Sequence, residues 1–176
     1  DLLSGFDLAI MNENLGDFPT IVDISQELFK ATSPDILDAY AKEVMNLFER
    51  YGFSKPVGRF FNFNIGAVLA VEKLCTSGIP HIYIGEHSCE AQVPDTFKSF
   101  VHIVSSGNPE KISLMGHDEY TIKFSYIEQV AKTLGYTSIR GHFNDFIKIN
   151  ATEDLRFVML SKGRMSDDGE MICQFV

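Results

Sequence analysis

The stretch FDLAIMNENLGDFP, residues 6–19, determines the predicted fold. Its first part, Phe6 to Met11, is a short apolar run that stops at a polar turn, which is typical of a buried β-strand. A second such run, Ile79 to Ile84, ends in the polar turn Gly85-Glu86-His87-Ser88. Because helical segments separate the two runs, we expect them to be parallel neighbours in one sheet.

Three segments have the apolar spacing of helices, and a glycine follows each of them. The first begins at the capping sequence Ser33-Pro34-Asp35 and ends at Tyr51. The second extends from Ile65 to Ser77. The third extends from Ser125 to Leu134, and the spacing of Ser125 and Glu128 is that of a capping box.

Later strands are predicted at Thr137–Phe143, Leu155–Leu160 and Met171–Val176. The turn Ser166-Asp167-Asp168-Gly169 predicts that the last two form an antiparallel hairpin. The sequence therefore indicates a single α/β domain over residues 1–176. We expect parallel strands covered by helices, with a C-terminal antiparallel hairpin that makes the sheet mixed.

Composition restricts the partners. The net charge of −9 argues against nucleic acid and against an anionic membrane surface. The longest apolar run, Ile65 to Val71, is far shorter than the roughly 18 residues of a membrane span. The three cysteines are widely spaced and include no Cys-x-x-Cys pair, which favours a reducing, cytoplasmic location.

The sequence lacks the common catalytic motifs. There is no Gly-x-Gly dinucleotide turn, phosphate loop, His-Glu-x-x-His or Gly-x-Ser-x-Gly. Glu86, His87 and Cys89 lie close together, with His117 and Asp118 as the other candidate ligands. Neighbouring residues of an extended segment point to opposite sides, so we predict no metal site there. We interpret Cys89 as a small buried side chain.

Polar side chains follow both predicted strands. Asn12 and Glu13 leave the first, and Glu86 and His87 leave the second. Ligands of open α/β sheets bind beyond the carboxyl ends of the strands, so these four residues are expected to line one crevice. The alternative is that they are ordinary turn formers and solvated carboxylates.

Two segments, residues 12–19 and 116–126, resemble the MidA-like family of S-adenosylmethionine-dependent methyltransferases, which includes an arginine methyltransferase. The matching positions in the first segment are Asn12, Glu13, Leu15 and Pro19. Gly16 and Asp17 stand where the family has Asp and Ala. In the second segment Ser125 replaces the usual Asp before the helix.

The resemblance implies a partial, Rossmann-like methyltransferase sheet. The family's glycine-rich loop and ribose-binding acid precede the Asn-Glu segment, so we expect this chain to be the C-terminal part of such an enzyme. S-adenosylmethionine would be the cofactor of the complete protein, with weak or absent binding by this chain alone. Asn12 and Glu13 are expected to face the cofactor and act in catalysis. Pro19, Glu86 and His87 are expected to contact a protein substrate with a cationic side chain.

Two other functions stay open at this point. The chain is alternatively a non-catalytic binding or assembly module derived from the same fold. It is alternatively a small hydrolase or isomerase that uses Glu13 or Glu86 with His87. If the chain is such a half-fold, the apolar strand at residues 6–11 is a poor edge strand, and we expect a second copy, a partner chain or a rearranged segment of this chain to cover it. The alternative is that this strand already has two strand neighbours within a complete small domain.

Overall fold

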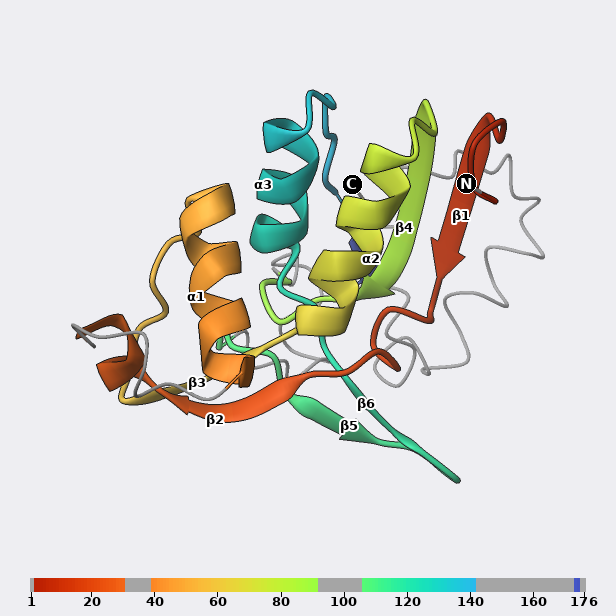
Figure 1. Cartoon of the computed structure of the whole chain (residues 1–176). Helices are drawn as coiled ribbons and strands as arrows, with labels where there is room; N and C mark the ends of the chain where they lie inside the picture. Colours follow the sequence, from red (N-terminus) through yellow and green to blue (C-terminus); the bar gives the residue numbers. More distant parts are fainter. Residues whose placement is uncertain (1, 31–38, 92–105, 142–172, 175–176) are drawn as a thin grey trace.

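The computed structural model describes residues 2–30, 39–91, 106–141 and 173–174. These residues form a mixed α/β structure in which helices lie beside small sheets (Figure 1). The strands are β1 Leu8–Asn12, β2 Ile21–Ser25, β3 Phe60–Phe63, β4 His81–His87, β5 Lys111–Ser113, β6 Asp118–Tyr120 and β7 Cys173–Gln174. The helices are the 3₁₀ turn η1 Gln26–Lys30 and the α-helices α1 Ala39–Tyr51, α2 Ile65–Thr76 and α3 Phe124–Thr133.

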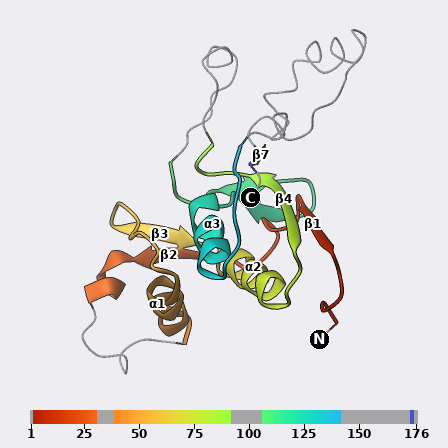
Figure 2. The same cartoon turned by 90° about the horizontal axis from the view of Figure 1, so that it is seen from above.

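The sheet that carries the polar strand ends has the order β1-β4-β7. β1 and β4 are parallel, with Leu8 opposite His81 and Asn12 opposite Gly85, which confirms the predicted pairing. β7 is antiparallel to β4, so the sheet is mixed. Helices α2 and α3 lie on the same side of β4 (Figure 2).

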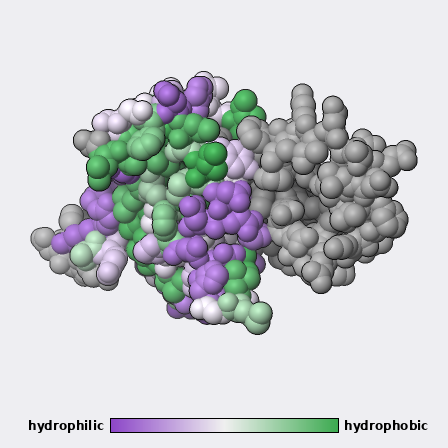
Figure 3. Space-filling model, turned by 90° about the vertical axis from the view of Figure 1, so that its right-hand side faces the viewer, coloured by the Kyte–Doolittle hydropathy of each residue, from purple (hydrophilic) through white to green (hydrophobic). Residues whose placement is uncertain are grey.

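The prediction of a buried strand at Phe6–Met11 was wrong in both extent and burial. The strand begins at Leu8, and Leu8 and Ile10 are 52% and 63% exposed. In the described part of the chain β1 has β4 as its strand neighbour and is an edge strand, which leaves these side chains in contact with solvent. On this side of the molecule, apolar surface adjoins a hydrophilic band (Figure 3).

The predicted C-terminal ends of the three α-helices agree with the structure better than their predicted starts do. Gly52, Gly78 and Gly135 follow the three α-helices with φ between 62° and 90°, a conformation that glycine adopts without strain. The capping sequence at 33–35 lies outside the described residues. The predicted capping box of α3 was wrong: the cap position is Lys123, and both the amide and the hydroxyl of Ser125 donate to the Glu90 carboxylate.

The later strands were predicted less well. Residues 137–141 form no strand, and the rest of that segment, residues 155–160 and the turn at 166–169 lie outside the described part. Of the last predicted strand, Cys173–Gln174 is a strand and is antiparallel to β4. Two antiparallel pairs, β2–β3 and β5–β6, were not predicted.

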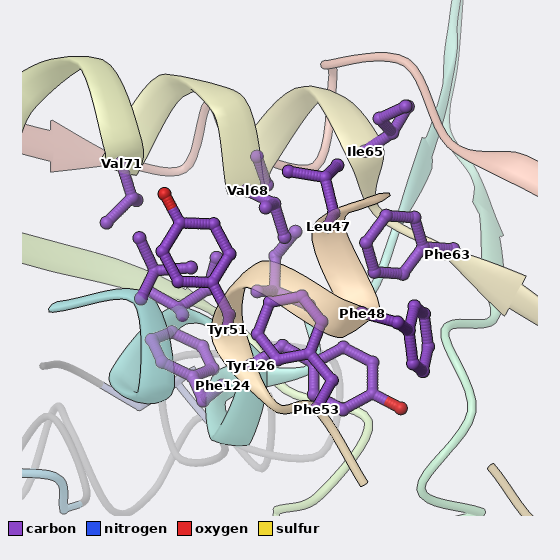
Figure 4. Packing of buried hydrophobic residues seen from close by; sticks show 14 of the residues in the cluster. Leu47, Phe48, Tyr51, Phe53, Phe63, Ile65, Val68, Val71, Phe124 and Tyr126 are labelled. Atoms are coloured by element: carbon purple, nitrogen blue, oxygen red, sulfur yellow. The ribbon is translucent and has the colours of Figure 1, made fainter. Parts of the chain in front are cut away.

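Aromatic rings fill the core between α1, α3 and β3 (Figure 4). The Phe48 ring on α1 packs against several others, with centroid distances from 4.9 Å to Phe29 to 5.9 Å to Phe61. Phe53 stacks on Tyr126 of α3 at 4.5 Å. Burial of such rings contributes roughly 1.5–3 kcal/mol each, so this cluster fixes the helices against the sheet ends.

Candidate functional site

Three chain segments meet at the carboxyl ends of β1 and β4. The turn after β1 joins β4 through the hydrogen bond from Glu13 N to Gly85 O, 2.8 Å. The segment after β6 joins both, because Tyr120 N donates to Gly16 O and Ile122 N donates to His87 O. These bonds bring together a set of charged side chains that we call the carboxyl-edge cluster. Its members are Glu13, Asp17, Glu86, His87, His117 and Glu119.

Glu86 is the most buried member, at 1% exposure. Its Oε2 accepts hydrogen bonds from Leu15 N at 2.9 Å and from Gly16 N at 3.2 Å. Its Oε1 accepts a bond from its neighbour His87 N at 3.1 Å. These amides solvate the carboxylate in place of water. Glu86 therefore holds the turn after β1, and the geometry does not favour the substrate contact that we predicted for it.

His87 lies between two carboxylates. Its Nδ1 is 3.7 Å from Glu86 Oε1 and 3.5 Å from Glu119 Oε1, and it makes no hydrogen bond within the described residues. The adjacent Glu86 raises the pKa of His87, burial acts in the opposite direction, and Glu13 and Glu119 raise it further. The neighbouring carboxylates therefore stabilise the protonated form of this ring relative to an imidazole in water.

Glu119 of β6 was not predicted as a site residue. Burial raises the pKa of its carboxyl, His87 lowers it, and the nearby carboxylates of Glu86, Asp17 and Glu13 raise it further. The net direction is upward. The cluster as a whole holds four carboxylates and two histidines, so its charge favours a cationic ligand.

Glu13 and Asn12 lie at the exposed side of the cluster. Glu13 has a φ of 50°, in the left-handed region that costs a non-glycine residue about 1–2 kcal/mol. Such strain is concentrated at functional sites. The Asn12 side chain lies close to Gly85. A Cβ added at position 85 would lie 2.7 Å from Asn12 Oδ1. A glycine at 85 therefore allows the Asn12 amide to lie over the end of β4.

Pro19 lies beside the first turn of α2. Its carbonyl accepts a hydrogen bond from Gly66 N at the start of α2, 2.9 Å away. A Cβ on Gly66 would lie 2.7 Å from Pro19 Cδ. The proline thus packs against α2, and its role as a substrate contact stays a prediction.

Asp17 and His117 complete the cluster on its solvent side. His117 Nε2 is 3.3 Å from Asp17 Oδ1, and both side chains are about half exposed. The sequence singled out His117 together with Asp118, but Asp118 binds Lys111 Nζ at 2.6 Å instead. The sequence pattern that could have pointed to Glu119 is the His-x-Glu spacing of His117 and Glu119, because residues two apart in an extended segment share a face.

Two other features do not contribute to this site. Burial raises the pKa of the Cys89 thiol to about 12, so a thiolate nucleophile is disfavoured there. A cavity of about 330 Å³ lies at the other end of the sheet, against α2 and α3. It is lined by apolar residues such as Val71 and Ile84 and by the start of β4, His81.

Comparison of the chain with protein-family models, with curated proteins and with solved structures finds no match. None of the helices in the described ranges has the length and apolar character needed to cross a membrane. The functional argument therefore depends on the geometry of the carboxyl-edge cluster.

Proposed function

We propose that this chain forms the acceptor side of an S-adenosylmethionine-dependent methyltransferase. The observation that carries the proposal is the parallel register of β1 and β4, which brings Asn12 and Glu13 to the same sheet edge as His87. The antiparallel β7 on the far side of β4 agrees with the mixed sheet that the C-terminal sequence predicts.

The cluster fits one end of the cofactor. Its carboxylates outnumber its histidines, so it favours a cationic sulfonium or guanidinium group. The sequence contains no Gly-x-Gly turn to hold a ribose and carboxylate. Asn12 and Glu13 are the residues that would face the bound cofactor, which supplies a methyl group on a positively charged sulfur.

The chain's own residues would position the acceptor and remove its proton. The Glu13 carboxylate would bind a cationic nitrogen at the exposed side of the cluster. The Glu13 carboxylate would accept the proton that this nitrogen gives up when it is methylated. Glu86 keeps the turn that bears Glu13 in place, and orientation supplies the main rate effect.

Methyl transfer tests this proposal directly. Purified protein is incubated with radiolabelled S-adenosylmethionine and arginine-containing peptides, as the 176-residue chain and as the chain extended by any coding sequence that precedes Asp1. We expect transfer by the extended chain and its loss in Glu13→Gln, with exposed Glu110→Gln as control. Inactivity of the extended chain would contradict the methyltransferase proposal, and micromolar cofactor binding by the 176-residue chain would contradict the half-fold.

A second candidate is acid–base catalysis by His87. The position of its Nδ1 between Glu86 and Glu119 favours this reading, because paired carboxylates orient an imidazole. The substitution His87→Gln separates the two functions. If the chain is a methyltransferase that depends on positioning, the variant should keep most of its activity. If His87 is an acid–base catalyst, the bell-shaped dependence of the rate on pH should disappear in the variant.

A further inference from the structure

The exposed side of the carboxyl-edge cluster contains three groups with the spacing of metal ligands. Asp17, His117 and Glu119 each offer one ligand atom, and these atoms all lie within 4.8 Å of one another. A metal ion that binds each atom at about 2.0–2.2 Å needs ligand atoms no more than about 4.4 Å apart, so a small side-chain rotation would close this set around an ion. Two carboxylates and one imidazole also balance the charge of a divalent cation.

The backbone places these groups without help from a ligand. Strands β5 and β6 form an antiparallel pair, and the hydrogen bond from Leu114 N to His117 O, 3.0 Å, continues it to the residue before β6. The ligand atoms of His117 and Glu119 lie on the same side of this segment. Asp118 points to the other face, where Lys111 and Ser113 bind it. The hydrogen bond from Tyr120 N to Gly16 O, 3.0 Å, then places Asp17 beside them.

Gly16 is required for this approach of the two segments. A Cβ at this position would lie 3.0 Å from the Tyr120 carbonyl oxygen and 3.4 Å from Glu119 Cβ. A larger residue would separate the turn from β6 by several tenths of an ångström. The close approach therefore depends on glycine at 16, next to the residue that supplies the first ligand.

Glu119 provides an independent reason to expect a cation. Its side chain is 8% exposed, and no N–H or O–H within the described residues donates a hydrogen bond to its carboxylate. Its contact with His87 Nδ1, at 3.5 Å, is longer than a hydrogen bond. Its oxygens are not fully sealed from solvent, so an ion can reach them, and a bound cation would supply the charge that no described donor provides. By contrast, Glu86 in the same cluster has three amide donors.

We propose that Asp17, His117 and Glu119 bind a divalent first-row transition metal ion such as Mn²⁺. The imidazole favours such a metal over Mg²⁺ or Ca²⁺, which prefer ligand sets of oxygen alone. His87 acts as the outer partner of Glu119, as ligating carboxylates usually have one. Asp17 and His117 are half exposed, so the remaining coordination positions face solvent and can accept water.

Titration of the metal-free protein with Mn²⁺, followed by calorimetry and by the electron paramagnetic resonance of the ion, tests the site. It requires no enzyme activity and is independent of the proposed methyltransferase function. We expect Asp17→Asn and His117→Asn each to weaken Mn²⁺ binding at least about tenfold. Both residues are exposed, so circular dichroism should show a native fold in both variants. Glu119→Gln should weaken binding as strongly.

Asp118→Asn is the matched control, because it removes one carboxylate from the opposite face of the same strand. It should leave Mn²⁺ affinity unchanged. Three outcomes overturn the proposal: a dissociation constant weaker than about 1 mM, unchanged affinity in Asp17→Asn and His117→Asn, or an equal loss of affinity in Asp118→Asn. The last outcome would show general attraction to an acidic surface.

Discussion

The buried carboxylate of Glu86 should contribute more to stability than any exposed acidic residue of this chain. In Glu86→Ala, the amides of Leu15 and Gly16 lose their acceptor in a region where both residues are buried. An unsatisfied buried donor costs about 1–3 kcal/mol, so these two amides predict a loss of about 2–6 kcal/mol. That is a large part of the roughly 5–15 kcal/mol that stabilises a typical domain.

The substitution Glu86→Gln should cost less, about 2 kcal/mol. Its carbonyl oxygen can still accept from Leu15 and Gly16, but its NH₂ group would face the His87 amide and the bonds would lose their charge assistance. Urea unfolding followed by circular dichroism measures both variants, since the chain has no tryptophan to report by fluorescence. Exposed Glu110→Gln should stay within about 0.5 kcal/mol of the parent.

A loss below about 1 kcal/mol in Glu86→Ala would refute the reasoning, because it would mean that the amides find other acceptors without cost. If the alanine variant does not fold, Glu86→Gln carries the measurement alone. Hydrogen exchange adds a local test. The amides of Leu15 and Gly16 should exchange faster in Glu86→Ala than in the parent, and amides in α1 should change only as far as global stability changes.

Three further predictions concern other positions. Glu13→Gly should raise the free energy of unfolding by about 1 kcal/mol, since it relieves a left-handed conformation; a lower urea midpoint would contradict this. Burial would raise the pKa of Glu90, but hydrogen bonds from Ser125 and its other partners lower it. The ionised Glu90 therefore stabilises the fold at pH values above its ordinary pKa, and this stabilisation is lost as the pH falls below about 4.3. In Glu90→Gln the melting temperature should therefore fall less steeply with decreasing pH than in the parent. Gly66→Ala should destabilise by about 1–3 kcal/mol, because the new Cβ would lie 2.8 Å from Pro19 N; an unchanged melting temperature would contradict it.

Sequence reasoning succeeded where local chemistry controls the structure. The helices end at Gly52, Gly78 and Gly135 because only glycine adopts those positive φ angles without strain. The parallel pairing of β1 and β4 followed from two apolar runs separated by helices. Periodicity and turn residues carry both kinds of information.

Prediction from the sequence failed where tertiary contacts control the structure. The strand β2 is irregular and has Asp23 at a φ of 54°, so its residues do not alternate between buried and exposed. Its partner β3 is only four residues long, and a side chain far away in sequence, Asn108, accepts the amide of Asn62. The cap of α3 failed for the same reason, since Ser125 binds Glu90 and not its own helix.

The candidate site shows both cases within one cluster. The alternation of side chains that argued against a metal on Glu86 and His87 is the same rule that places His117 and Glu119 on one face. Applying it required knowing that the chain is extended at 117–119, and placing Asp17 beside them required the contact between Gly16 and Tyr120. The sequence also could not show which carboxylate is structural and which is free to bind a ligand. Glu86 and Glu119 differ in the number of N–H groups that donate to them, and this number depends on the tertiary structure. Three amides donate to Glu86, which makes its carboxylate structural. No described N–H or O–H donates to Glu119, and its carboxylate is the one that we propose as a metal ligand.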